Sequence, residues 1–567
     1  MHARGNSLVA TRKRYLQRLA ALQAEQESWK PHWSDLSEYV LPRSTRIRSK
    51  ERNRGTKLND KIINNTATRA LGVLSAGMMA GITSPARPWF RLTTPDPSIA
   101  EVEAVKGWLH LVEERIRQAI AKSNLYNILP LVYQALGLHG TAVAVVDEDE
   151  EDTLRGYSLA IGTYYLANSA RMQVDTLYRE LRMTTAQLVE KFGHENCSET
   201  VRRQYDQGEY DTWHDVVHVI EPNRSREPER KDYRGKRWRS CWFEATGSDS
   251  LGFLREGGYD EKPFIAVRWD LTEGDVYGRS PGMDALGDIK ALQLFEKRKA
   301  QLVGKIVNPP MKGPSSLRNQ RTSLLEGDIT YLDPTAAGAT FEPAVVINPA
   351  AIPAVGEEIQ RHEQRINAAF YADLWLMMAQ SDRRQITATE IEERHEEKML
   401  QLGPVLERVM DELLDPLIDI VFSILWNSGR IPPPPQELQG VADLKVEYIS
   451  IMAQAQRMLG IVGVDRLASF VGSLVAVKPD VVDKLNADQM VDEYAAMLGT
   501  KPDLVNSDDR VAEMRDARNQ AAAQQAQMEQ MTVAAQGAKT LSETDTGTDN
   551  ALTQLMGAMG GLAGGVA

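Results

Sequence analysis

The sequence predicts an α+β protein that is mainly α-helical. Between Tyr277 and Trp426, apolar residues recur at helical spacing in three long segments, which are separated by a compact insert and a short polar loop. Residues 154–271 instead indicate β structure, with short apolar runs joined by turns rich in glycine and charge. Helices and strands do not alternate one by one, which argues against a parallel βαβ sheet.

Two of the long helices flank the insert. Ser280 is a cap-type residue, and Pro281 suits the first helical position. Asn308-Pro309-Pro310 ends the first helix, because proline disfavours helical geometry in the residue before it. Each helix has its apolar residues on one side. In the first they are Leu286, Ile289, Leu292, Phe295, Leu302 and Ile306. In the second they are Ile352, Val355, Ile359, Ile366, Phe370, Leu374 and Met377.

A polar loop separates the second helix from the third. The loop is the run Gln380-Ser381-Asp382-Arg383-Arg384-Gln385. Thr387-Ala388-Thr389-Glu390 then has the pattern of a capping box, in which a Thr hydroxyl and a Glu carboxylate satisfy free amides. The helical pattern continues to Asn427-Ser428-Gly429, a helix of about 60 Å at 1.5 Å per residue. Few single-chain domains need so long a helix, which indicates that this helix spans a distance greater than the width of an ordinary domain.

The part before this stretch predicts helices followed by strands. Residues 7–30 predict a basic amphipathic helix, whose charges fit a solvated face better than a nucleic-acid contact. Residues 43–61 are polar and very basic and indicate a loop, whereas the small residues of 64–81 indicate a buried helix. Further expected elements are helices at 102–121, 125–138 and 184–192, and strands at 142–146, 216–220, 238–243 and 264–269.

The remaining segments are shorter or biased in composition. The insert at 309–349 predicts a small α/β knob, and Pro432 to Pro435 a stiff polyproline segment. A strand is expected at 446–449 and several short helices at 452–498. Beyond residue 520 the composition shifts to Gln, Ala, Met, Ser and Gly, which predicts a low-complexity, mobile tail.

Composition excludes several classes of protein. The chain has 567 residues and a formal charge of −12, whereas a sequence-unspecific DNA-binding protein is normally basic. Two cysteines, Cys197 and Cys241, provide neither a disulfide framework nor a metal-ligand set, so a reducing compartment is expected. The N-terminus lacks the apolar core of a signal peptide. The most apolar run, 413–426, is interrupted by Asp415, Pro416 and Asp419, so we expect no contact with a membrane.

The motifs of enzymes and metal sites are missing from the sequence. An ATPase of the P-loop type needs Gly-x4-Gly-Lys-Ser/Thr, and neither Gly235-Lys236 nor Gly304-Lys305 is followed by Ser or Thr. His214 and His218 share one face of an expected strand without a third ligand, so hydrogen-bonded or surface histidines are favoured over metal ligands. The acidic run 147–152 fits the solvated end of a hairpin better than a cation site. We therefore expect no catalytic residue, no metal and no cofactor.

Several motifs occur in the order found in one viral family. The segment Ala76-Gly77-Met78-Met79-Ala80-Gly81-Ile82-Thr83-Ser84-Pro85, with Pro88-Trp89-Phe90 behind it, resembles the N-terminal signature of podovirus (T7-like) head-to-tail connector, or portal, proteins. Ser123-Asn124-Leu125-Tyr126, with Tyr133 and Gly140-Thr141, is also similar to that signature. Gly278-Arg279-Ser280-Pro281, the two helices around the knob and the capping box follow the same layout. The resemblance covers roughly residues 10–500.

The resemblance implies a portal fold with named parts. These are a wing at 1–278, stem helices at 279–307 and 349–378, a clip at 308–348, a channel loop at 379–387, a long wing helix at 388–429, and a β segment with a helical crown at 430–520. The tail at 521–567 matches no part of the family, so its role stays open.

The resemblance also implies partners. Portals are rings, typically of twelve subunits, at one capsid vertex of the virion, and the chain would be made in the host cytoplasm. Double-stranded DNA would pass through the ring during packaging and ejection. The ring would dock the terminase and then the tail adaptor, and would contact the major capsid and scaffold proteins. Internal core proteins are further partners that such a position allows.

Two groups of residues are candidates for contacts in such a ring. The channel loop would consist of Gln380, Ser381, Asp382, Arg383, Arg384 and Gln385. Arg383 and Arg384 would meet phosphates in the bore, or instead form ion pairs with a neighbouring subunit. In the clip, Lys312, Arg318 and Arg321 would face the terminase or the adaptor, with the same alternative. Twelve copies carry a formal charge of −144, twelve times −12, which favours DNA sliding over tight binding.

Two other hypotheses compete with the portal ring. A packaging enzyme such as a terminase subunit lacks support, because the P-loop and an isolated carboxylate cluster are missing; a DNA-stimulated ATPase activity would revive it. A helical tail adaptor or scaffold protein without a channel remains as the alternative. A particle without a central hole would favour that alternative.

Overall fold

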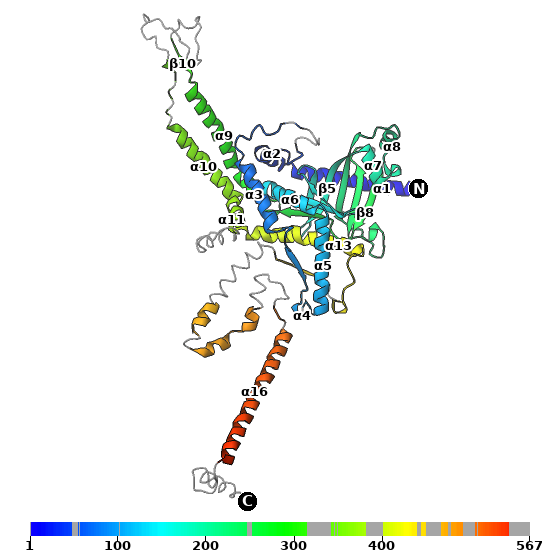
Figure 1. Ribbon diagram of the computed structural model, residues 1–567. Helices are drawn as coiled ribbons and strands as arrows, with labels where there is room; N and C mark the ends of the chain where they lie inside the picture. Colours follow the sequence, from blue (N-terminus) through cyan, green and yellow to red (C-terminus); the bar gives the residue numbers. More distant parts are fainter. Residues whose placement is uncertain are drawn as a thin grey trace. The chain divides into compact units, whose positions relative to one another are not determined.

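A computed structural model describes residues 2–47, 55, 57–100, 102–246, 252–313, 342–344, 346, 348, 350–381, 401–438, 444–449, 467–474, 478–491, 505–506 and 508–543. The chain divides into two compact units, Met1–Leu459 and Gly460–Ala567. The first unit mixes helices and sheets, and the described part of the second is helical (Figure 1). In the described part of the chain, no helix combines the length and the apolar character that crossing a membrane requires.

Helices dominate the N-terminal part of the first unit. They are α1 (His2–Gln26), α2 (Lys30–Tyr39), α3 (Thr66–Gly81), α4 (Pro97–Ala100), α5 (Glu103–Lys122) and α6 (Leu125–His139). The single helix expected at 7–30 is therefore α1 alone, and α2 starts separately at Lys30 with Pro31 in its first turn. The prediction of a buried helix rich in small residues is confirmed in α3, because Leu71 and Leu74 are fully buried.

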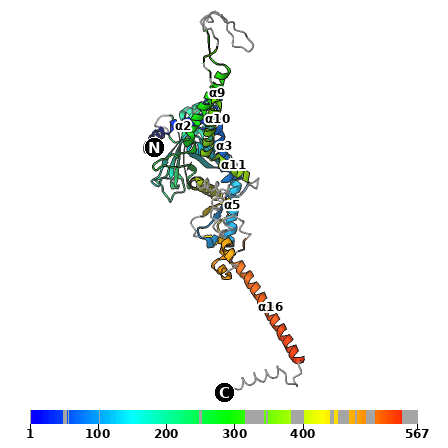
Figure 2. The same ribbon diagram turned by 90° about the vertical axis from the view of Figure 1, so that its left-hand side faces the viewer.

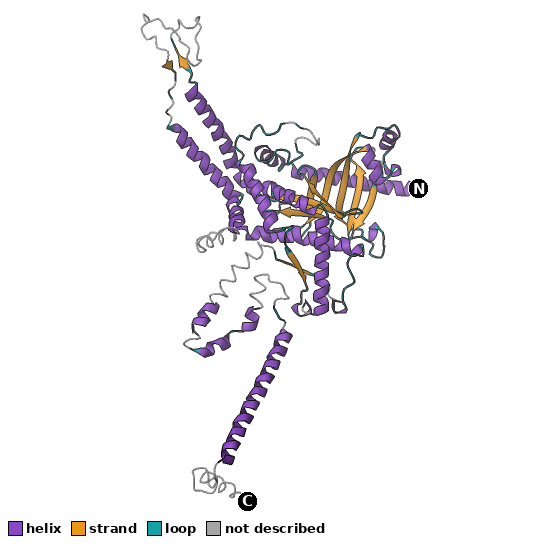
Figure 3. Cartoon of the chain, in the orientation of Figure 1, coloured by secondary structure: helices purple, strands orange, loops and turns teal. Residues whose placement is uncertain are grey.

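A five-stranded antiparallel sheet follows in the order β4-β5-β6-β7-β8. Its strands are β4 (Tyr164–Asn168), β5 (Val174–Thr184), β6 (Trp213–Pro222), β7 (Trp238–Glu244) and β8 (Arg255–Tyr259). Successive residues of a strand point to opposite faces of the sheet, and both faces of this sheet are covered. On β6, Val217 packs with Tyr15 of α1, whereas its neighbour Val216 packs with Leu188 on the other face. The strands gather in one part of the unit (Figure 3).

Short helices cover the second face of this sheet. They are α7 (Thr185–Phe192), η1 (His194–Asn196) and α8 (Glu199–Asp206), and η2 (Tyr233–Gly235) lies in the β6–β7 connection. Thr184 forms a capping box with Gln187 at the start of α7. The predicted helix at 184–192 is thus confirmed.

A second sheet has three antiparallel strands in the order β3-β2-β9. They are β2 (Thr141–Asp149), β3 (Thr153–Leu159) and β9 (Phe264–Arg268). The acidic run 147–152 is the end of the β2–β3 hairpin, and the Asp149 carboxylate accepts the backbone N–H groups of Glu151 and Asp152. The prediction of a hairpin end is confirmed. A further pair joins β1 (Phe90–Thr93) to β12 (Lys445–Tyr448), far apart in the sequence.

The central stretch contains the expected long helices, with two differences. They are α9 (Pro281–Val307), α10 (Ala351–Ala369), α11 (Ala372–Ser381), a helical run at 401–409, the π-helical turn η4 (Met410–Leu414) and α13 (Asp415–Asn427). The single helix predicted at 349–378 is wrong, because the chain breaks at Tyr371, whose φ is +55°. The prediction of one uniform helix at 388–429 missed the π-helical turn, and residues 388–400 lie outside the described residues.

Tertiary packing explains the break at Tyr371. A non-glycine residue in the left-handed region costs about 1–2 kcal/mol. Phe370 on one side of the break and Leu374 on the other are both fully buried, and the Tyr371 ring lies 6.1 Å from that of Trp269. Burying these side chains compensates for the strained backbone, and no local pattern in the sequence announces it.

The described part of the second unit consists of helices. It contains the helical segments 467–474 and 487–491, η6 (Pro479–Lys484) and α16 (Asp508–Glu543). Short helices at 452–498 were expected, and those inside the described residues agree. The helix α16 was not predicted: residues 521–543, assigned to the low-complexity tail, continue it for more than six turns.

Gly140 allows two backbone segments to approach at the start of the central stretch. It ends α6 with φ of +78°, and a Cβ there would overlap the carbonyl oxygen of Gly278. We expect Gly140→Ala to lower the unfolding free energy by more than the 1–2 kcal/mol typical of backbone strain alone. Gly208→Ala is the matched control, because Gly208 has φ of +81° with open space around it. Equal shifts in thermal unfolding for both variants would contradict the proposed overlap.

Candidate functional site

The paired helices α9 and α10 form the longest hairpin of the first unit. They lie side by side, with the short strands β10 (Met311–Lys312) and β11 (Glu342–Pro343) at their far end (Figure 1), and Figure 2 shows the hairpin turned by 90°. Ser280 caps α9: its hydroxyl accepts the N–H of Met283 at 3.0 Å and donates to the carbonyl of Leu138 at 2.7 Å. Ser280, which the sequence indicates as the cap of α9, therefore also ties α9 to the end of α6.

Apolar and polar contacts hold α9 against α10. Ile289 of α9 and Ile366 of α10 are fully buried. Farther along, the Phe295 ring stacks on the His362 ring with a centroid distance of 5.4 Å. The Nδ1 atom of His362 lies 2.8 Å from Oδ1 of Asp288, which joins the helices by a polar contact next to the stacked rings.

A buried amide fastens the hairpin to the segment before α3. The Gln293 side-chain oxygen accepts the N–H groups of Ile63 and Asn64 at 2.7 and 2.8 Å, and its amide donates to the Asn64 carbonyl at 2.8 Å. The Asn64 amide in turn donates to Glu296 of α9 at 3.0 Å and to Glu363 of α10 at 2.9 Å. One short segment thus binds both helices of the hairpin.

The far end of the hairpin holds one predicted partner-binding residue. Lys312 forms an ion pair of 2.9 Å with Glu342 across the β10–β11 pair, and both side chains are exposed. An exposed pair of this kind contributes at most about 1 kcal/mol. Lys312 therefore remains accessible to a partner. Arg318 and Arg321 lie outside the described residues, as does most of the predicted α/β knob.

The first residues of the predicted channel loop are helical. Gln380 and Ser381, assigned to the loop from the sequence, are the last residues of α11. Asp382, Arg383, Arg384 and Gln385 lie outside the described residues, as does the expected capping box. Trp375 positions α11, because its ring lies so close to Gly77 of α3 that a Cβ at Gly77 would overlap it. The helix rich in small residues thus gives α11 a flat surface.

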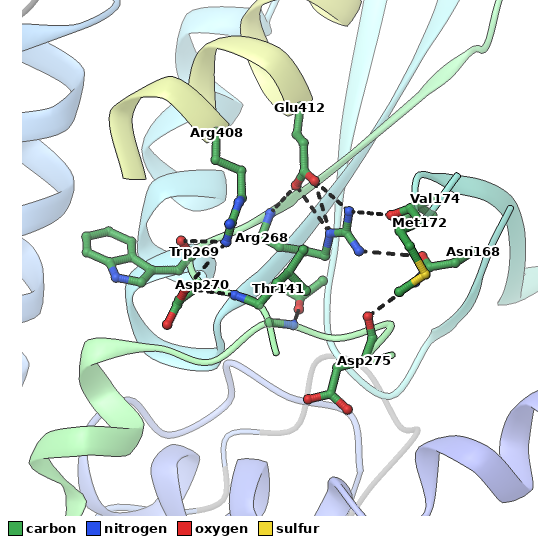
Figure 4. A network of polar contacts seen from close by, with 12 residues as sticks. Thr141, Asn168, Met172, Val174, Arg268, Trp269, Asp270, Asp275, Arg408 and Glu412 are labelled. Atoms are coloured by element: carbon green, nitrogen blue, oxygen red, sulfur yellow. Dashed lines mark hydrogen bonds and ion pairs between the residues drawn. The ribbon is translucent and has the colours of Figure 1, made fainter. Parts of the chain in front are cut away.

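A buried ion pair connects the three-stranded sheet to the long helix. Arg268, the last residue of β9, has a side chain that is only 3% exposed. Its guanidinium donates to both carboxylate oxygens of Glu412, with a shortest distance of 2.5 Å, and its backbone N–H donates to Glu412 at 2.9 Å (Figure 4). The same guanidinium donates to the carbonyl of Met172 at 3.2 Å.

The π-helical turn η4 carries Glu412. A single wide turn shifts the following side chains around the helix axis, and such turns are frequent at functional sites. One turn earlier, Arg408 donates to the carbonyl of Trp269 at 3.4 Å and pairs with Asp270 at 3.6 Å (Figure 4). The Asp270 carbonyl also accepts the N–H of Arg279, just before α9 begins. The junction thus orients the base of the hairpin.

The sequence did not predict the contact between Arg268 and Glu412. Arg268 was placed within an apolar strand expected at 264–269, and its charge there was the signal that could have marked it. A lone charge in a buried strand requires a partner, because an unpaired buried charge is costly. The partner lies 144 residues away, so the sequence alone could not identify it.

The histidines considered as metal ligands have protein partners. The Nδ1 atom of His218 accepts from Arg179 Nε at 2.9 Å, and its Nε2 lies 2.9 Å from the Ser240 hydroxyl. Burial lowers the pKa of His218 well below its ordinary value, so the ring is neutral. His214 lies 3.1 Å from the Thr185 hydroxyl. The prediction of hydrogen-bonded histidines is confirmed, and the described residues contain no group of three His, Cys, Asp or Glu side chains suited to a metal ion.

The Arg268–Glu412 pair gives a testable expectation for stability. We expect Glu412→Gln to lower the free energy of unfolding by about 3–5 kcal/mol, because it leaves the buried Arg268 charge without a carboxylate. Asp284→Asn is the control: it breaks the exposed pair with Arg279 and should cost at most about 1 kcal/mol. Scanning calorimetry of both variants measures the difference. A Glu412→Gln variant as stable as the control would contradict this role.

Comparisons with known proteins show sequence similarity to phage proteins over most of the chain. Residues 12–505 match the family described as "Bacteriophage head to tail connecting protein". The chain is 46% identical over 551 residues to the portal protein of Salmonella phage epsilon15, covering 97% of this chain and 98% of that protein. It is 45% identical over 552 residues to a probable portal protein of Bordetella phage BPP-1, covering 97% and 99%.

A solved structure is similar at a much lower level. It is the neck of an empty gene transfer agent particle, with 12% identity, a TM-score of 0.33 and coverage of 77% of this chain and 91% of that chain. The family match and the two phage relatives each extend over most of the chain. The chain therefore belongs to the bacteriophage head-to-tail connecting, or portal, protein family, whose members are structural components of the phage particle and not enzymes.

Proposed function

We propose that the chain forms a closed ring of twelve copies at one vertex of the phage capsid. Double-stranded DNA passes through the centre of this ring when it is packaged into the head and when it is ejected. The observation that carries the proposal is the match to a portal protein at 46% identity over nearly the whole length of both chains. A match restricted to one segment would allow a different assembly, whereas this one extends over 97% of this chain and 98% of the relative.

The proposed parts follow the helices of the first unit. Helices α9 and α10 are the stem, and residues 308–348 between them are the clip. The channel loop follows α11 and extends to residue 387, and the other parts are 388–429 as the long wing helix, 1–278 as the wing, and 430–520 as the β segment and crown. The antiparallel hairpin of α9 and α10, with a small strand pair at its far end, supports this division.

The proposed partners differ along the chain. The clip, with Lys312, Arg318 and Arg321, docks the terminase during packaging and the tail adaptor afterwards. The wing contacts the major capsid and scaffold proteins. The crown lies inside the head, where internal core proteins are accessible to it. The chain is made in the host cytoplasm and becomes part of the portal vertex of the virion.

The charge of the chain suits a conduit. Affinity for DNA comes mainly from neutralised phosphates, and the chain carries a formal charge of −12. An acidic wall with few cations lets DNA slide. Arg383 and Arg384 are the proposed phosphate contacts within the loop Gln380–Gln385.

Electron microscopy of the purified full-length chain tests the ring. Class averages viewed along the particle axis should show a closed ring with an open centre, and their rotational symmetry gives the number of copies. A particle without a central hole would contradict the conduit and would favour a tail adaptor or scaffold.

The channel loop gives a second test of this function. We expect Arg383→Ala combined with Arg384→Ala to leave ring assembly intact and to reduce the DNA retained in filled heads, because two phosphate contacts per subunit are lost. The control is Arg202→Ala combined with Arg203→Ala, which removes an adjacent arginine pair from α8. DNA retention is measured from the ratio of filled to empty heads. Normal retention in the loop variant would exclude the loop from contact with DNA.

A further inference from the structure

The side of α9 that faces away from α10 is uncovered in its outer half. Phe295 and Asp288 define the side that contacts α10. At 3.6 residues per turn, Lys297, Gln301 and Gly304 fall on the opposite side, and all three are exposed. A Cβ at Gly304 would meet no other atom within 4 Å. Val307, beside this side, is 79% exposed.

The side of α10 that faces away from α9 is uncovered too. His362 and the buried Ile366 define its contact with α9. Glu357, Gln364 and Ala368 lie on the opposite side at helical spacing, and all three are exposed. Their side chains are short or polar, so a second helix can approach closely along this side.

The two uncovered sides carry opposite charge. On the uncovered side of α9 the central charged residue is Lys297, with Arg298 and Lys305 about 100° and 80° around the helix from it. On the uncovered side of α10 lies Glu357, with Arg361 one turn farther along the helix. Glu358 pairs with Arg361 at 2.6 Å. Lys297 and Glu357 form no hydrogen bond or ion pair with any residue that the structure describes. Each of them is thus available to a partner.

Rotational symmetry brings these two sides together at a defined level. In a closed ring, each hairpin presents α9 to one neighbour and α10 to the other, and equivalent residues lie at the same height along the axis. Phe295 lies opposite His362, so in antiparallel helices Ala300, five residues on, lies level with Glu357, five residues back. Lys297 is about 4.5 Å from that level along the axis, within reach of a lysine side chain.

We propose that α9 of each copy packs against α10 of the next copy around the ring, with Lys297 paired to Glu357 of the neighbouring copy. This proposal rests on the proposed ring. Ala300 and Gly304 provide the close approach between the two helices, and the ion pair sets their register. The contact is heterologous: two different surfaces of the same chain meet, which is the type of interface that closes a ring.

Charge reversal with exchange tests the proposed pair. The full-length variants are Lys297→Glu, Glu357→Lys and the double exchange, and ring fraction is measured by light scattering after size exclusion and by electron microscopy. Lysine and glutamate are both good helix formers, so far-ultraviolet circular dichroism should show an unchanged fold. Each single variant places like charges at every interface and should lower the ring fraction about tenfold. The double exchange should restore it.

Arg298→Glu is the matched control for net charge. Arg298 is exposed and lies about 100° around α9 from Lys297, away from the proposed contact. The ring fraction of this variant should equal that of the unmodified chain. An equal loss in the control would show that total charge, and not the pair, governs assembly, and would overturn the proposal.

Other outcomes separate this proposal from the proposed function. Rings that form normally from both single variants, or a double exchange that restores nothing, would overturn the pairing while the ring itself stands. Normal rings from Lys297→Glu with reduced DNA retention would place Lys297 in the bore instead. An unmodified chain that forms no ring would overturn the proposed function and the pairing with it.

Discussion

The buried ion pair between Arg268 and Glu412 is the constraint on which the arrangement of the first unit depends. A guanidinium that is 3% exposed must have its charge compensated within the protein, because removal of its hydration costs several kcal/mol. The carboxylate of Glu412 compensates it through both oxygens and also accepts the backbone N–H of Arg268. A helix shifted by one residue would carry this carboxylate away from the strand. The pair therefore sets the register between the three-stranded sheet and the long helix.

The same junction defines where the α9–α10 hairpin begins. Trp269 and Asp270 follow Arg268 directly: the N–H of Trp269 donates to the carbonyl of Gly140, and the carbonyl of Asp270 accepts from Arg279. Gly140 ends α6 and Ser280 starts α9, so strand, helix end and helix start meet at one place. Farther along α9, the contacts of Gln293 and Asn64 fasten the hairpin a second time. A hairpin held at its base and again near its middle is fixed there, whereas α9 beyond Glu296 runs alongside α10. Such a design suits a helix pair that completes its packing with other copies of the chain.

Opposite requirements for charge are met by different parts of the chain. A conduit for DNA works best with few accessible cations, and the formal charge of −12 meets that requirement. The outer half of α9 departs from this average, with four basic residues within nine positions. The proposed pairing of Lys297 with Glu357 of a neighbouring copy would keep that cation from phosphates. On this view, the ion pairs between subunits contribute both to the register of the ring and to the mobility of the DNA.

Local patterns in the sequence determined most helices, most strands and the family. Ser280-Pro281 and Asn308-Pro309-Pro310 bound α9 because caps and prolines act within a few residues, and the small residues of α3 predicted its burial. Only the tertiary structure decided the break at Tyr371, the π-helical turn at Met410–Leu414 and the pairing of β1 with β12. Each of these involves residues distant in sequence: the Tyr371 ring lies near that of Trp269, Arg268 contacts Glu412 across 144 positions, and β1 pairs with β12. The spacing of apolar residues shows which side of a helix is apolar. The element that covers that side is defined only when the chain has folded, and so is any strained residue that the packing requires.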